Sequence, residues 1–175
     1  MNTRIRRAFT EDIDAIVGVH RASVTELCAT SYNVEQIFAW TSKHSTDAGK
    51  QRWADKIQKE FVWVLEIEGM ICGFAHFRLL SEPHPSGYLN ALYLAPSVAG
   101  HGYGKQILDT IENECLHRQI SRVQTHATKN ALSFYKRMGF KQTGEVYVVS
   151  MSGVGVESFP MEKELRANPT NSRDM

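Results

Sequence analysis

A glycine-rich run separates a strand pattern from a helix pattern near the middle of the chain. Residues 99–105 read Ala-Gly-His-Gly-Tyr-Gly-Lys and follow an apolar, strand-like segment at residues 88–94. Beyond the run, Ile107, Leu108 and Ile111 fall on one helical face. Glycines let a backbone approach an anion closely, and the first N–H groups of a helix lack internal partners. This order of strand, loop and helix predicts a site for a phosphate-bearing ligand.

The spacing of the three glycines excludes two common phosphate-binding motifs. A P-loop requires Gly-Lys-Ser/Thr at its end, but Lys105 is followed by Gln106. A dinucleotide fingerprint requires Gly-x-Gly-x-x-Gly, whereas Gly100, Gly102 and Gly104 are separated by single residues. On this motif alone, a helix that merely begins in a glycine-rich loop is an equal alternative.

A second segment decides between these alternatives. Residues 130–140 read Asn-Ala-Leu-Ser-Phe-Tyr-Lys-Arg-Met-Gly-Phe. Together the two segments resemble the Gcn5-related N-acetyltransferase (GNAT) family, whose loop reads Gln/Arg-x-x-Gly-x-Gly/Ala and whose later segment reads Asn-x-x-x-x-Tyr before a Gly-Phe pair. Gly102 and Gly104 match the loop, and Asn130 and Tyr135 match the later segment.

The resemblance extends over residues 4–165 and departs from the family pattern at one loop position. Ala99 stands where the family usually has Gln or Arg. Because the family's loop binds mainly through backbone N–H groups, we expect this change to weaken the phosphate site rather than abolish it.

The resemblance implies acetyl-CoA as co-substrate. GNAT proteins bind it between two splayed parallel strands, with the pantetheine arm on unpaired backbone groups and the pyrophosphate on the loop. No metal is expected, and the seven histidines show no metal-ligand spacing. The cofactor-binding residues implied are Leu92, Tyr93, Leu94, Gly100, His101, Gly102, Tyr103, Gly104, Lys105, Asn130, Ser133, Phe134 and Tyr135.

Tyr135 is the candidate general acid. A phenol has an ordinary pKa near 10, so at neutral pH it holds a proton that it can donate to a departing thiolate. As a lone tyrosine it would be read as a core aromatic, because it shares an apolar helical stripe with Phe134 and Met138. Its position five residues after Asn130 reverses that interpretation through the family resemblance.

The general base is less evident. The strand before the loop offers only Tyr88 and Asn90, and neither is a good base. His76 and Glu26 are weak candidates, and His84, His101 and His126 are further histidines to consider. An imidazole titrates in the useful pH range, although a sheet histidine is more often simply hydrogen-bonded. A chain of water molecules would make a dedicated base unnecessary.

The acceptor is expected to be a small-molecule or peptide amine. Aromatic side chains before residue 54 and the carboxylates Glu26 and Glu35 suggest a pocket for an amine with an apolar body. The aromatic residues are Tyr32, Phe38, Trp40 and Trp53. Ordinary core packing is an equal alternative for Phe38 and Trp53. The implied reaction is direct attack of a primary amine on acetyl-CoA in a ternary complex, and a non-catalytic acyl-CoA sensor is the alternative.

Charge and composition narrow the remaining classes. The 175 residues contain 20 Lys plus Arg and 19 Asp plus Glu, a near balance that disfavours nucleic-acid binding. The three cysteines lie far apart, which favours a reducing cytoplasm over a disulfide framework. No apolar run reaches the roughly 18 residues of a membrane span. We expect a cytoplasmic monomer or homodimer with no membrane association.

Hydrophobic periodicity predicts one α/β domain over residues 1–166 and a polar, disordered tail over residues 167–175. The order of the predicted elements suits a mixed sheet of about seven strands with helices on both faces, and it resembles the topology of the GNAT family. Predicted strands are 3–9, 61–67, 70–80, 88–94, 121–127, 140–151 and 154–165. Predicted helices begin near Thr10, as an N-cap, and near Asn33, as part of a capping box with Gln36, and cover about 47–59, 102–118 and 130–138.

Overall fold

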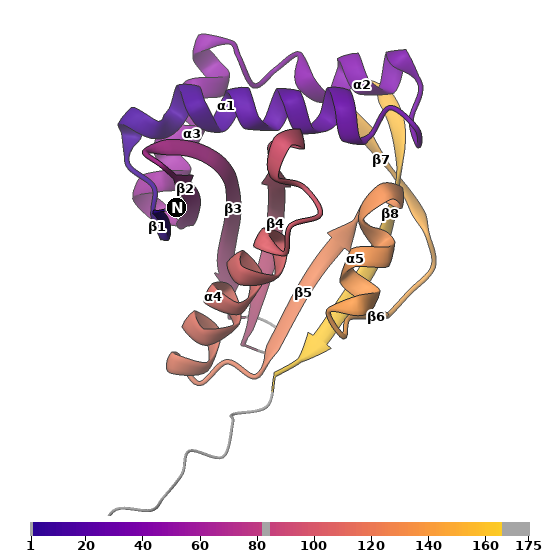
Figure 1. Ribbon diagram of the computed structural model, residues 1–175. Helices are drawn as coiled ribbons and strands as arrows, with labels where there is room; N and C mark the ends of the chain where they lie inside the picture. Colours follow the sequence, from indigo (N-terminus) through magenta and orange to yellow (C-terminus); the bar gives the residue numbers. More distant parts are fainter. Residues whose placement is uncertain (1, 82–84, 166–175) are drawn as a thin grey trace, which may run out of the picture.

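A computed structural model describes residues 2–81 and 85–165 and arranges them around one mixed sheet (Figure 1). The strands are β1 (Thr3–Arg7), β2 (Phe61–Ile67), β3 (Met70–Leu80), β4 (Ser86–Leu94), β5 (Arg122–Ala127), β6 (Lys141–Gln142), β7 (Tyr147–Met151) and β8 (Val154–Glu164). The α-helices are α1 (Ile13–Ala22), α2 (Val34–Thr41), α3 (Asp47–Lys59), α4 (Tyr103–His117) and α5 (Leu132–Arg137). Short helical turns are η1 (Thr10–Asp12), η2 (Ser23–Leu27, a π-helical turn), η3 (Pro96–Val98) and η4 (Lys129–Ala131).

The sheet has the order β1-β2-β3-β4-β5-β8-β6, and β7 pairs with β8 off this path. In the described part of the chain, β4 and β5 form the one parallel pair and the other pairs are antiparallel. The predicted α/β class and mixed sheet are confirmed. The sheet has eight strands rather than about seven, because the strand predicted over 140–151 is split into β6 and β7. The split lies opposite Pro160 of β8, which has no N–H to continue the ladder.

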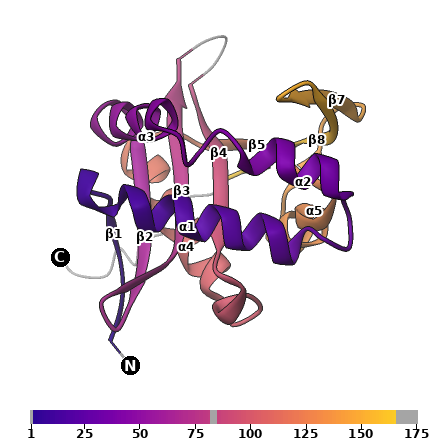
Figure 2. The ribbon, with the colours of Figure 1, turned by 90° about the horizontal axis from the view of Figure 1, so that it is seen from above.

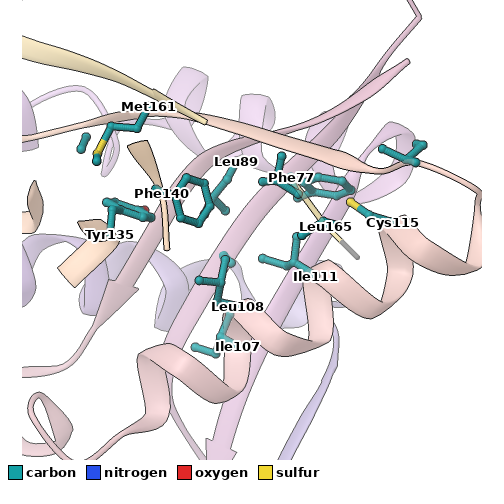
Figure 3. Close-up of a cluster of buried hydrophobic side chains, with 14 of the residues drawn as sticks. Phe77, Leu89, Ile107, Leu108, Ile111, Cys115, Tyr135, Phe140, Met161 and Leu165 are labelled. Atoms are coloured by element: carbon teal, nitrogen blue, oxygen red, sulfur yellow. The ribbon is translucent and has the colours of Figure 1, made fainter. Parts of the chain in front are cut away.

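Side chains on the two faces of the sheet alternate, as a strand period of two requires. Phe77 and Leu89 face α4, which presents Leu108 and Ile111 to them, all at 1 % exposure or less (Figure 3). The face under α1 and α3 is formed by a second cluster, including Val62, Val64, Phe74 and Trp53. Figure 2 shows α1 lying across β2, β3 and β4, with α2 near β7.

The helix starts follow the sequence in one case and not in the other. Asn33 and Gln36 form the predicted capping box, each side chain accepting the other residue's backbone N–H at 2.9–3.0 Å. Thr10 does not cap a helix as predicted. Instead η1 already begins at Thr10 with Phe9 as its N-cap residue, and the Asp12 carboxylate accepts the N–H of Phe9 at 2.8 Å.

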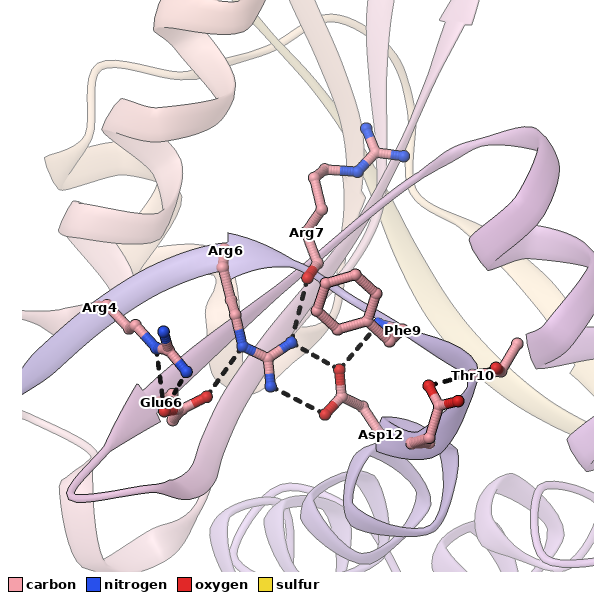
Figure 4. A network of polar contacts seen from close by, with 8 residues as sticks. Arg4, Arg6, Arg7, Phe9, Thr10, Asp12 and Glu66 are labelled. Atoms are coloured by element: carbon pink, nitrogen blue, oxygen red, sulfur yellow. Dashed lines mark hydrogen bonds and ion pairs between the residues drawn. The ribbon is translucent and has the colours of Figure 1, made fainter.

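Arg6 ties the start of α1 to the β1–β2 edge (Figure 4). Its guanidinium donates to both carboxylate oxygens of Asp12, at 2.7 and 2.9 Å, and its Nε donates to Glu66 at 2.8 Å. Hydrogen bonds from Arg6 hold the pKa of the Asp12 carboxyl below its usual value. This partly buried fork fixes where α1 leaves the sheet, and so fixes the wall that α1 gives to the site.

The predictions of no membrane-spanning segment and of a disordered tail concern different parts of the chain. No helix among residues 2–81 and 85–165 is long and apolar enough to cross a membrane. The predicted disordered tail at 167–175 lies outside the described residues, as does His84.

Removing the Ile111 side chain tests the packing of α4 on the sheet. Ile111 is fully buried among large apolar side chains, so we expect Ile111→Ala to lower the free energy of unfolding by about 2–5 kcal/mol. Urea denaturation measures this change. Gln106→Ala on the same helix is the control, because Gln106 is exposed and should shift stability by less than about 0.5 kcal/mol. Equal effects of the two substitutions would contradict the described orientation of α4.

Candidate active site

The parallel strands β4 and β5 pair over only three residues each. The paired residues are Gly87 with Val123, Tyr88 with Gln124, and Leu89 with Thr125. The Thr125 hydroxyl donates to the Leu89 carbonyl at 2.8 Å, which closes the ladder at this point. Beyond it the two strands diverge (Figure 1). The edge of β4 from residue 90 to residue 94 therefore has no strand partner on the β5 side.

A bulge on the other side of β4 begins at the same place. Leu89 pairs with Phe77 of β3, and Ala91 pairs with His76, so Asn90 has no opposite residue. A bulge bends a strand and increases its local twist. The extra residue therefore turns β4 away from β5 where their pairing ends. From the sequence, Asn90 was considered only as a base, and the bulge was not predicted. The alternation of side chains along a strand gives no signal for a single inserted residue.

A cavity of about 340 Å³ occupies the divergence between the strands. Seven of the predicted cofactor residues line it: Leu92, Tyr93, Leu94, Gly104, Asn130, Phe134 and Tyr135. The π-helical turn η2 and the β7–β8 hairpin complete its wall through residues that sequence reasoning missed, including Ser23, Leu27, Met151 and Val156. These segments are distant in sequence, so only the tertiary fold could reveal them.

The glycine loop presents a row of free backbone donors at the mouth of this cavity. The N–H groups of residues 100–104 have no hydrogen-bond partner within the described residues, whereas Lys105 N–H already donates to Gly102 at 3.1 Å. Gly102, the N-cap of α4, has φ = +84°, which favours glycine. Five adjacent donors at a helix start form the arrangement expected for a pyrophosphate.

The loop side chains contribute less than its backbone. The Lys105 amino group is paired with Asp109 at 2.6 Å, and His101 Nδ1 lies 3.0 Å from the Ala99 carbonyl oxygen. Along with Tyr103 and Ser133, both residues lie outside the set that lines the cavity. Their predicted contacts with the ligand remain predictions.

Gly104 lies in a tightly packed position. A Cβ built at this position would lie 3.2 Å from the Phe134 ring and 3.7 Å from Leu94. Gly104 thus allows α4 to approach both Phe134 on α5 and the end of β4. This close approach sets the width of the cavity between the loop and α5.

Tyr135 is both a core aromatic and a lining residue of the cavity. It is 6 % exposed and packs edge-to-face on Phe134 and Phe140 at centroid distances of 5.2 and 5.3 Å. Burial raises its pKa to about 12, partly offset by a hydrogen bond with Thr125. The phenol therefore holds its proton at any physiological pH, as a general acid must.

Cys28 also lines this cavity, but its chemistry does not suit a covalent intermediate. It is 2 % exposed, and burial raises the pKa of its thiol to about 11. The thiol rather than the nucleophilic thiolate is present at neutral pH. Cys28 acts as a small apolar wall residue.

A second cavity, of about 460 Å³, adjoins the first. The two share Trp40, Asn90, Ala91, Tyr93 and Met151 as lining residues. Asn90, Ala91 and Tyr93 of β4 therefore border both cavities, which adjoin at the stretch of β4 that has no partner on β5. An acyl group held in the first cavity would lie beside a molecule held in the second.

Of the two candidate bases, His76 reaches this second cavity and Glu26 reaches neither. His76 is 4 % exposed, lines the cavity and is bonded through Nε2 to the Glu60 carboxylate. Burial lowers the pKa of His76, an effect that Glu60 partly offsets. Glu26 is exposed on η2. Sequence reasoning missed Glu60, because a residue at the end of α3 gives no sign of its partner on β3.

The predicted acidic and aromatic acceptor wall is only partly assembled. Trp40 and Trp53 line the second cavity, whereas Phe38 is 71 % exposed and Glu35 is exposed. Tyr32 instead accepts the backbone N–H of Lys129 at 2.7 Å and supports the start of η4. His126, the remaining histidine considered, lines the first cavity and contacts the hydroxyls of two tyrosines.

Comparison with known proteins agrees with this geometry. Residues 28–165 match the family described as the acetyltransferase (GNAT) domain. The uncharacterized N-acetyltransferase YafP of Escherichia coli K12 is 26 % identical over 160 residues, which cover 91 % of this chain and 95 % of that protein.

Two solved structures share the fold. A GCN5-related N-acetyltransferase from Rhodopseudomonas palustris superposes with a TM-score of 0.82 at 24 % identity and covers 94 % of this chain and 97 % of its own. The PaiA N-acetyltransferase from Thermoplasma acidophilum, solved in complex with coenzyme A, has a TM-score of 0.75 at 24 % identity, with 94 % and 99 % covered. The chain belongs to the GNAT family and is an acetyltransferase. This membership favours the enzyme over the sensor considered from the sequence.

The buried imidazole of His20, on the wall of the second cavity, should make stability depend on pH. Burial, His44 and Lys56 lower its pKa to about 3 from an ordinary value near 6.5. Between these values the unfolded chain binds the additional proton, so stability decreases as the pH falls below about 6.5. His20 alone should lower the free energy of unfolding by about 2 kcal/mol when the pH falls from 7 to 5.

Urea denaturation of the wild type and His20→Gln at both pH values measures this dependence. We expect the substitution to reduce the pH-dependent change, whatever its effect on stability at pH 7. His117→Gln, at an exposed position on α4, is the control and should leave the change intact. An unaltered pH dependence in His20→Gln would show that His20 is not held neutral by the fold.

Proposed function

We propose that this protein transfers the acetyl group of acetyl-CoA to a primary amine by direct attack in a ternary complex. The proposal rests on one observation. The stretch of β4 that has no partner on β5 lines two adjoining cavities, which share Asn90, Ala91 and Tyr93. A thioester in one cavity and an amine in the other, both beside Ala91 and Tyr93, can meet without a covalent protein intermediate. The high pKa of Cys28 agrees with this order of events.

The residues present fit acetyl-CoA, which supplies the activated acyl thioester. The free N–H groups of residues 100–104 suit a pyrophosphate. The unpaired edge at Leu92–Leu94 offers backbone donors and acceptors to an amide-bearing arm, and Asn130 lines the same wall. One N–H of this edge, directed at the acyl oxygen, would stabilise the negative charge that develops there.

In this proposal Tyr135 and His76 handle the two protons of the reaction. Tyr135 lines the first cavity, keeps its phenolic proton at neutral pH and donates it to the departing sulfur. His76, kept neutral by burial, accepts a proton from the amine in the second cavity. The Nε2–Glu60 contact orients the ring and leaves Nδ1 as the basic nitrogen.

Replacing Tyr135 with phenylalanine tests the general acid. Tyr135→Phe keeps the ring and its packing but removes the proton, so we expect kcat to fall by about 10²- to 10⁴-fold while coenzyme A binding is retained. Thiol release from acetyl-CoA measures kcat, and calorimetry measures binding. Tyr147→Phe, at an exposed phenol outside both cavities, should keep full activity. Full activity in Tyr135→Phe would remove Tyr135 from the mechanism.

Replacing His76 tests the base through its pH profile. In the wild type, kcat/KM should rise with pH through the pKa of His76, below the ordinary value near 6.5. His76→Gln should lower kcat/KM most at neutral pH and progressively less as the acceptor amine loses its own proton at higher pH. Glu60→Gln should give a smaller loss, because the ring keeps a hydrogen-bond partner. A loss in His76→Gln that is constant across pH would indicate a structural role only.

A further inference from the structure

The second cavity carries positive charge and no acidic side chain on its wall. Its ionisable lining residues are His20, Lys43, His44, Lys56, His76 and Tyr93. Neither Lys43 nor Lys56 forms an ion pair within the described residues. The carboxylate that influences Lys56, Glu60, is already bonded to His76. The carboxylates expected from sequence to attract an amine, Glu26 and Glu35, are exposed and line neither cavity.

Lys56 is the cation that most needs a partner. It is partly buried, and its Nζ lies 4.7 Å from the centroid of the Trp53 ring. Burial lowers the pKa of Lys56 from its usual value, which means that its charge has lost part of its hydration. Partly dehydrated charges bind opposite charges more strongly than exposed ones do, because the surroundings screen the attraction less.

An imidazole beside this lysine has an unsatisfied nitrogen. His20 is 2 % exposed, lines the cavity, and has no hydrogen-bond partner for Nδ1 among the described residues. Its ring lies 4.2 Å from that of His44 and 4.8 Å from that of Tyr93, centroid to centroid. Buried polar atoms in folded proteins are generally hydrogen-bonded. A molecule bound in the cavity, or a water molecule there, would satisfy this nitrogen.

We propose that the acceptor is an amine that also carries an anionic group, a carboxylate or a phosphate, which binds beside Lys56 while the amine lies toward His76. This inference rests on the proposed N-acetyl transfer and names the class of its acceptor. Lys56 and His76 line one cavity of about 460 Å³, which suits a molecule of amino-acid size. Lys43 stands at the exposed side of the same cavity, where it adds to the attraction.

Matched acceptor pairs test the proposal. The carboxylate arm compares leucine with leucinamide and phenylalanine with phenylalaninamide; the phosphate arm compares 2-aminoethyl phosphate with ethanolamine. Thiol release from acetyl-CoA gives kcat/KM for each. We expect the anionic member of at least one arm to be favoured by about tenfold or more, the size typical of a hydrogen bond to a charged group. The arm with the larger ratio identifies carboxylate or phosphate as the anion.

Substitutions at Lys56 connect this preference to the cavity. Lys56→Met should reduce the anionic-to-uncharged ratio by about tenfold, chiefly through KM of the anionic member, and Lys56→Arg should preserve it. KM of the anionic member is read together with the ratio, because Lys56 also influences His76 and its loss therefore alters kcat as well. Lys59→Met, exposed on the same helix and outside both cavities, is the matched control.

The outcomes separate this inference from the proposed function. Thiol release that is equal for both members of every pair, or a ratio unchanged in Lys56→Met, would overturn the anionic acceptor and leave N-acetyl transfer standing. Absence of thiol release with every amine would overturn the proposed transfer for these acceptors. Calorimetry with the same pairs then still decides on the cavity: preferential binding of the anionic member that is lost in Lys56→Met supports the inference, and equal or undetectable binding of both contradicts it.

Discussion

The end of the β4–β5 ladder at Leu89 and Thr125 is the constraint on which the rest of the site depends. Neighbouring strands of a sheet normally satisfy each other's backbone groups along their length. Here the pairing stops while both strands continue, so the edge of β4 must find other partners. Water or a ligand with alternating donors and acceptors can provide them, whereas an ordinary apolar ligand cannot. The backbone thereby selects the chemistry of the bound molecule before any side chain is considered.

The divergence is held open by packing on both sides. On β4, the bulge at Asn90 turns the strand at the same residue where pairing ends. On β5, pairing with β8 continues to Ala127 and draws the strand away from β4. On the α4 side, Gly104 leaves space for the Phe134 ring of α5, which a Cβ at this position would approach to 3.2 Å. The site is thus a consequence of sheet twist and of one glycine, and Tyr135 is placed by the same helix that closes the gap.

The predictability of these features follows the range of the interactions involved. The strand–loop–helix unit around Gly102 and the helix that carries Tyr135 were recognised because their signals are local. The capping box of Asn33 was also local and correct. The helical turn does begin at Thr10, but the N-cap predicted there was wrong, because Phe9 is the N-cap residue and Asp12 accepts its N–H. The division of the last strands depends on Pro160, which acts on a segment that precedes it by about 15 residues.

Contacts between side chains of different helices and strands were not predicted from the sequence. Glu60 and His76 are brought together by the packing of α3 on the sheet. The charge of the acceptor side was expected to be negative because Glu26 and Glu35 lie in the correct stretch of sequence. Their side chains face outward, and Lys56, which gave no sequence signal, lines the cavity instead. Whether a cavity is positively or negatively charged depends on which face of each helix lines it. A single charged residue in the sequence does not show which face that is.

The charge of the second cavity bears on both binding and proton transfer. Lys56 lowers the pKa of His20, His44 and His76, in addition to the effect of burial. This keeps the imidazoles neutral, but a base with a low pKa is a weak base. An anion bound beside Lys56 would offset its field and so strengthen His76 as a base when an acceptor of the proposed class is present. Without such an anion, burial and Lys56 both lower the pKa of His76, which favours the neutral imidazole that the proposed base requires.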